Sequence, residues 1–94
     1  MQFSADAAET FALQVLAWLV ADEDLLGVFL NSSGADEDDL RTRAQDPEFL
    51  GSVLDFLMLD DAWVMRFCDT QRISYERVMQ ARAALPGGAQ INWT

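Results

Sequence analysis

The chain has 94 residues, of which 51% are hydrophobic and 23% charged, a composition typical of a folded globular protein rather than a disordered chain. This length allows one hydrophobic core and excludes a second domain. The formal net charge is −10 and the six basic residues are all Arg. A basic patch that binds nucleic acid is therefore not expected.

Neither a membrane span nor a secretory signal is evident. The longest apolar run, from Phe11 to Ala21, contains Gln14 and is well short of the roughly 20 residues that a membrane-spanning helix needs. The first residues lack the basic start of a signal peptide, and Cys68 is the single cysteine, so no internal disulfide can form. We expect a cytoplasmic protein without membrane contact.

The first half of the chain predicts three helices. Ser4 is a good N-cap for a helix from about Ala5 to Ala21, and Asp22 caps a short second helix that ends at Asn31-Ser32-Ser33-Gly34. Asp36 and Asp39 resemble a capping box that opens a third helix, from Glu37 to about Ala44. Six apolar residues wrap most of the first helix, which predicts a central helix covered by others: Phe11, Val15, Leu16, Trp18, Leu19 and Val20.

The second half predicts three more helices. Asp46-Pro47 starts one from Pro47 to Leu59, Asp60 caps the next from Asp61 to about Gln71, and Ser74 caps the last from Tyr75 to Ala84. Apolar residues recur at helical spacing and strands are not evident. The sequence therefore predicts an all-α fold, a compact bundle of about six short helices in a single domain over residues 1–94.

An internal repeat is indicated by a shift of 38 residues. It aligns Phe11 with Phe49, Asp22 with Asp60 and Phe29 with Phe67, with further identities at Val15/Val53, Leu16/Leu54 and Leu19/Leu57. We interpret this as two three-helix units, about 8–45 and 46–83, related by a pseudo-twofold axis. The alternative is that any two amphipathic helices of similar length align this well.

The residues that usually carry enzyme chemistry are scarce. The chain has no His, which removes the commonest general base. Cys68 lies on the apolar face of its predicted helix without a His partner, which favours a core residue over a nucleophile. We expect no catalytic residue and no cofactor.

The acidic residues are concentrated at helix starts. Eleven of the sixteen acids lie at predicted caps or first turns, and residues 1–40 contain nine acids and no base. Asp36-Glu37-Asp38-Asp39 lacks the ligand pattern of a calcium loop, so we expect no metal site. Asp55 stands apart in mid-helix, where it pairs with an Arg such as Arg66 or Arg77 or faces water.

The C-terminal segment, residues 86–94, contains two large apolar residues near its end, after the helix stop Leu85-Pro86-Gly87-Gly88. Ile91 and Trp93 either fold back into a groove of the bundle, which we favour, or present an apolar anchor to a partner. Trp63 and Asp55 complete the set of candidate partner-binding residues.

A series of short motifs covers nearly the whole chain: Ala12-Leu13-Gln14-Val15-Leu16-Ala17-Trp18-Leu19, Leu26-Gly27-x-Phe29-Leu30, Gly34 with Asp39-Leu40-Arg41-x-Arg43-Ala44, Asp46-Pro47-x-Phe49-Leu50, Val53-Leu54-Asp55-Phe56-Leu57 and Ala83-Ala84-Leu85-Pro86-Gly87-Gly88. The order of these motifs resembles an uncharacterised bacterial family, domain of unknown function 3572, whose members are small helical proteins found mainly in alphaproteobacteria. The resemblance implies an all-helical fold without an assigned activity.

The leading hypothesis for function is a non-enzymatic module that binds another protein, as an adaptor or small regulator. One alternative is a self-associating structural protein, so that the chain is a monomer or a homodimer. A second is an enzyme or metal sensor that uses carboxylates and Arg, such as Asp55 with Arg41 or Arg66. A third is an acidic mimic of DNA.

Overall fold

The computed structural model describes residues 4–86, and these form six α-helices without a strand. The predicted all-α fold is confirmed. The largest difference in bounds is at the fourth helix, which was predicted to continue to Leu59. The helices are α1 Ala5–Val20, α2 Glu23–Ser33, α3 Glu37–Arg43, α4 Pro47–Leu57, α5 Asp61–Gln71 and α6 Tyr75–Ala83.

The helices begin where their caps predict. The Ser4 hydroxyl accepts a hydrogen bond from the Ala7 N–H at 3.1 Å, and Asp36 and Asp39 form the complete capping box. Carboxylates likewise cap α2, α4 and α5. Ser74 occupies the N-cap position of α6, as predicted, but its hydroxyl makes no capping hydrogen bond.

Two helices end in the left-handed conformation. Gly34 follows α2 with φ 75°, as its lack of a side chain favours. Arg72 follows α5 with φ 57°, which is uncommon for a residue other than Gly. The turn at Arg72 was not predicted because helical periodicity carries no signal for it.

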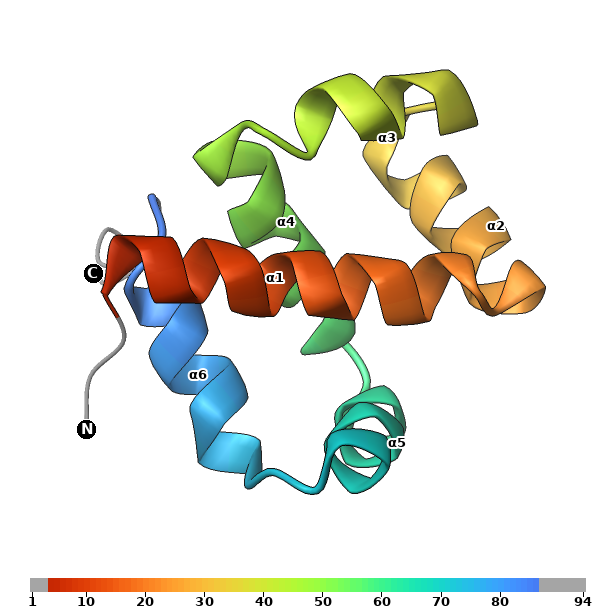
Figure 1. Ribbon diagram of the computed structural model, residues 1–94. Helices are drawn as coiled ribbons and strands as arrows, with labels where there is room; N and C mark the ends of the chain where they lie inside the picture. Colours follow the sequence, from red (N-terminus) through yellow and green to blue (C-terminus); the bar gives the residue numbers. More distant parts are fainter. Residues whose placement is uncertain (1–3, 87–94) are drawn as a thin grey trace, which may run out of the picture.

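The centre of the fold is the contact between α1 and α4 (Figure 1). In this view α2 and α3 lie above or beside α1, while α5 and α6 lie below it. Helix α1 also packs against α2 and α6, and α6 packs against α4 and α5. The described residues form one compact body with a radius of gyration of 12.5 Å.

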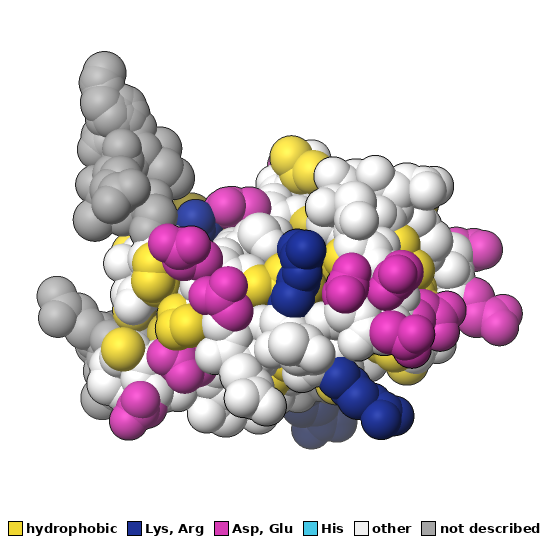
Figure 2. All heavy atoms as spheres, turned by 90° about the horizontal axis from the view of Figure 1, so that it is seen from above, with side chains coloured by type: hydrophobic (Ala, Val, Ile, Leu, Met, Phe, Trp, Pro, Cys, Tyr) yellow, Lys and Arg dark blue, Asp and Glu magenta, His cyan; other side chains and the backbone are white. Residues whose placement is uncertain are grey.

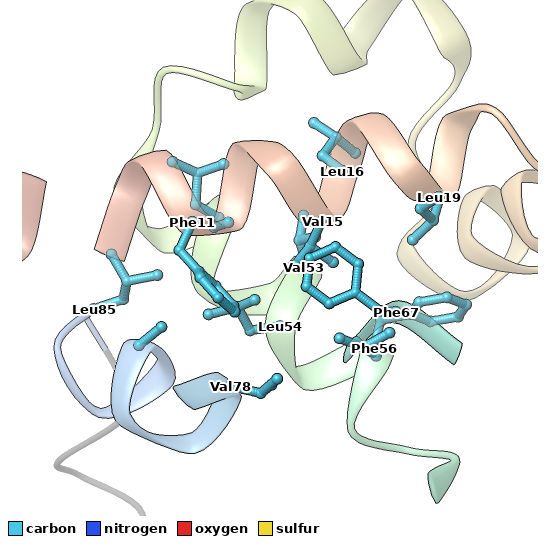
Figure 3. Packing of buried hydrophobic residues seen from close by; sticks show 14 of the residues in the cluster. Phe11, Val15, Leu16, Leu19, Val53, Leu54, Phe56, Phe67, Val78 and Leu85 are labelled. Atoms are coloured by element: carbon cyan, nitrogen blue, oxygen red, sulfur yellow. The ribbon is translucent and has the colours of Figure 1, made fainter. Parts of the chain in front are cut away.

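Aromatic rings fill the core from both sides of α1 and α4. Phe67 of α5 is fully buried and meets Phe11 and Trp18 of α1 edge-on, with ring centroids 5.8 and 5.6 Å apart. Phe29 of α2 makes similar contacts with Phe49 and Phe56 of α4. Figure 3 shows Val53 and Leu54 of α4 between these groups, with Val78 approaching from α6.

Helix α1 is the central helix that its apolar residues predict, but it is not covered on every side, and Val20 is the one of those six residues that is exposed. Leu13 and Val20 are 41% and 40% exposed, and Ala17 between them is also exposed. These three positions form one stripe, because residues four and three apart lie on the same helical face. The reason is that α3, which lies near this stripe, is too short to cover it.

The internal repeat stays a prediction. The aligned phenylalanines Phe11/Phe49 and Phe29/Phe67 are all buried, and Asp22 and Asp60 both cap helices. The third helices differ, however: α6 packs closely against three other helices, whereas α3 makes only peripheral contacts.

The packing of α6 on α4 depends on a glycine. Gly51 is buried in α4, and a Cβ atom there would lie 2.9 Å from Nη1 of Arg82 and 3.2 Å from the Pro86 carbonyl oxygen. Both distances are shorter than ordinary carbon contacts. Gly51 therefore provides the space in which the Arg82 guanidinium lies.

We predict opposite effects of alanine at two helical glycines. Gly51→Ala displaces the Arg82 side chain and destabilises the protein by about 1–3 kcal/mol, despite the better helix propensity of alanine. Gly27→Ala, in α2 with no atom near the added Cβ, stabilises it by about 0.5–1 kcal/mol. Urea unfolding measures both, and a stabilising Gly51→Ala would contradict the packing described.

Candidate interaction surface

Asp55, a predicted site residue, belongs to a half-buried ion pair between α4 and α6. The guanidinium of Arg82 donates from Nε to Oδ1 of Asp55 at 2.6 Å and from Nη2 to Oδ2 at 3.0 Å. Its Nη1 donates to the Pro86 carbonyl oxygen at 3.0 Å. Arg82 is 8% exposed, whereas the Asp55 side chain is 49% exposed. One guanidinium thus connects α4, α6 and the turn that follows α6.

This pairing corrects the predicted partners of Asp55. Arg66 instead donates to Asp22 at 3.0 Å and lies over the Trp18 ring, so it connects α5 to the corner between α1 and α2. Because both carboxylate oxygens of Asp55 accept from Arg82, the arrangement fixes two helices together rather than presenting a free carboxylate.

The hydrogen bonds of Asp22 lower the pKa of its carboxyl. The largest cause is the N–H of Leu25 at the start of α2, followed by the hydrogen bond from Arg66. The ionised form is therefore favoured by the native structure.

The predicted aromatic anchors have different outcomes. Trp63 is half-buried, with its ring stacked on Phe56 at a centroid distance of 4.8 Å. It is thus largely part of the core, and a contact with a partner stays a prediction. Ile91 and Trp93 lie outside the described residues.

A methionine-lined groove opens between α5 and α6. It has a volume of about 510 Å³, and the end of α4 closes one side of it. Met65, Tyr75 and Met79 are 46%, 46% and 58% exposed. The groove is lined by Met58, Asp61, Val64, Met65, Tyr75, Val78 and Met79. We call it the methionine groove.

Helices α5 and α6, which form the walls of the methionine groove, carry equal numbers of acidic and basic residues, although Asp61 is the one charged residue in the lining. Asp61 and Asp69 in α5 and Glu76 in α6 are matched in number by Arg66, Arg77 and Arg82 of the same helices. Met65, Tyr75 and Met79 were not predicted as site residues, because apolar residues of the helices were expected in the core. The available signal was the placement of large apolar residues on the outward side of two short helices.

A second groove, of about 520 Å³, lies where α1, α2 and α3 meet. The exposed stripe of α1 forms one wall, and Leu40 and Ala44 of α3 contribute to the other. It is lined by Leu13, Leu16, Ala17, Val20, Leu26, Glu37, Leu40, Arg41 and Ala44. We call it the α1–α3 groove.

Cys68 is a core residue, as predicted. Its side chain is fully buried and its thiol lies 3.8 Å from the Ser74 carbonyl oxygen. Burial, together with the neighbouring charge of Asp69, raises the pKa of the thiol. The reactive thiolate is therefore disfavoured at neutral pH.

Neither a metal site nor a membrane-spanning helix is found in residues 4–86. Within this range no three His, Cys, Asp or Glu residues are grouped so that they could hold a metal ion. None of the described helices combines the length and apolar character required to cross a membrane.

The order of helices and motifs matches one protein family. The family is described as "Protein of unknown function (DUF3572)", and the match extends over residues 5–88. This chain belongs to that family. No curated protein and no solved structure matches it. Membership therefore confirms the resemblance found in the sequence, and the family description assigns no activity.

We predict unequal effects of breaking the Asp55–Arg82 ion pair from its buried and its exposed side. Asp55→Ala leaves the guanidinium of Arg82 buried without its counter-charge and costs about 2–4 kcal/mol. Arg82→Met leaves a half-exposed carboxylate that water can solvate and costs about 1 kcal/mol. Urea unfolding of both variants and of the double variant measures the difference, and equal costs would contradict it.

We predict that Asp22 contributes to the acid sensitivity of the fold. Because its folded-state pKa is depressed, its contribution is present above the unfolded value near 4 and is lost as the pH falls through the lower folded value. The Tm of wild type should exceed that of Asp22→Asn at about pH 7, and the two should converge at about pH 2. Asp38→Asn is the control, and a difference in Tm that persists in acid would contradict the prediction.

Proposed function

We propose that this protein is a non-enzymatic interaction module that binds an amphipathic helix of another protein in the methionine groove. The observation that carries the proposal is the groove itself, in which Met65, Tyr75 and Met79 leave a continuous apolar surface open between two helices. Apolar residues exposed together, rather than singly, are characteristic of binding surfaces.

The shape of the groove favours a helical occupant. Side chains of α5 and α6 form its walls, and an amphipathic helix places its apolar face into an apolar groove through residues at i, i+3, i+4 and i+7. Methionine side chains suit this role because they are flexible and polarisable and adapt to different apolar partners.

The charges around the groove favour a partner without a strong net charge. Helices α5 and α6 sum to zero, and Asp61 is the one carboxylate among the lining residues. Binding should thus come from apolar burial and depend little on salt.

Site-specific photo-crosslinking tests this function. A photoreactive residue at Met79 should crosslink, in lysate of cells that carry this chain, to a segment of another protein with apolar residues at helical spacing. Met65→Gln, which preserves side-chain length but removes apolar character, should reduce the yield about tenfold. The matched control places the photoreactive residue at Leu59, which is 75% exposed and outside the groove.

Three results would contradict the proposal. They are equal crosslinking from positions 79 and 59, crosslinks to a second copy of this chain, and crosslinks from position 79 to residues 87–94 of the same chain. The second result would support the self-associating alternative instead.

A further inference from the structure

The α1–α3 groove is an apolar surface in the acidic part of the molecule. Leu13, Ala17 and Val20 of α1 form one wall at spacings of four and three residues, so that an exposed apolar stripe runs along the helix. Leu26 of α2 and Leu40 of α3 extend this surface from two further helices.

Glutamates from three different helices lie around this surface. Glu37 lines the groove itself, as does Arg41. Glu9 lies one helical turn before Leu13 in α1, and Glu23 lies one turn before Leu26 in α2, so both share a face with a lining residue. Within residues 4–86 none of these three carboxylates forms an ion pair.

The charge of this region differs from that of the methionine groove. Helices α1, α2 and α3 carry a net charge of −5, from Asp6, Glu9, Glu23, Asp24, Glu37, Asp38 and Asp39 against Arg41 and Arg43. Figure 2 shows acidic side chains gathered at the end of the molecule where α2 meets α3, with basic side chains beside them. Capping explains why acids occur at helix starts, but it does not require them to surround an apolar groove.

We infer that the α1–α3 groove is a second interaction site, whose occupant is a basic amphipathic helix of another protein. The apolar face of such a helix covers Leu13, Ala17 and Val20, while its Lys or Arg side chains approach Glu9, Glu23 and Glu37. The site is distinct from the methionine groove, whose two helices sum to zero charge, so a protein with both sites can bind two different partners together.

The test uses a defined probe, a synthetic peptide of about 18 residues with Leu at helical spacing and Lys elsewhere. Its binding is followed by NMR amide shifts and by fluorescence anisotropy. We expect shifts confined to the α1–α3 groove. We also expect affinity to fall about tenfold in Glu9→Gln/Glu23→Gln/Glu37→Gln and as salt rises from about 0.05 to 0.5 M.

Matched variants separate this site from general attraction to an acidic protein. Asp61→Asn/Asp69→Asn/Glu76→Gln removes the same number of charges from α5 and α6 and should change affinity less than about twofold. Leu13→Gln/Val20→Gln should weaken binding about tenfold without altering net charge.

Two results would overturn the inference. One is amide shifts spread over all acidic surfaces or centred on α5 and α6, and the other is equal losses in the two charge variants. Neither result affects the photo-crosslinking test from Met79, so each of the two proposed sites can be disproved without the other.

Discussion

The packing of α1 on α4 is the contact on which the rest of the structure depends. These two helices carry most of the large buried side chains, among them Val15, Leu19, Val53 and Leu54, and every other helix contributes to the core by covering part of this pair. Phe67 from α5 and Phe29 from α2 enter the core from the two sides of the pair. The Arg82 guanidinium then fixes α6 to α4 through one residue pair, in a space that Gly51 leaves open.

The same arrangement explains why two apolar grooves remain. The four helices around the central pair are short, and α3 in particular ends after two turns. They therefore leave part of the apolar surface of α1 uncovered, and α5 and α6 leave part of their own. A chain of this length has a high ratio of surface to volume, and exposed apolar residues are expected singly. Their grouping into two grooves with different surrounding charge is what supports an interaction role over a purely structural one.

Local structure was predictable from the sequence, whereas the site was not. Asp36 and Asp39 form their capping box within one turn, so the interaction can be read from two neighbouring positions. Arg82 and Asp55 are far apart in the chain and meet only after α6 docks on α4, so Arg66 and Arg77 were equally plausible partners. The exposure of Val20 was not predicted, because an apolar residue has the same letter whether or not another helix covers it.

The most direct test of the interaction role is methyl NMR of protein labelled at the methionine methyl groups. The probe is a neutral amphipathic helical peptide of about 18 residues, with Leu on one face and Gln and Ser on the other. We expect the methyl signals of Met58, Met65 and Met79 to shift together as peptide is added. The three signals should share one midpoint peptide concentration, which salt hardly changes. Methyl signals that stay fixed while amides elsewhere shift would contradict it.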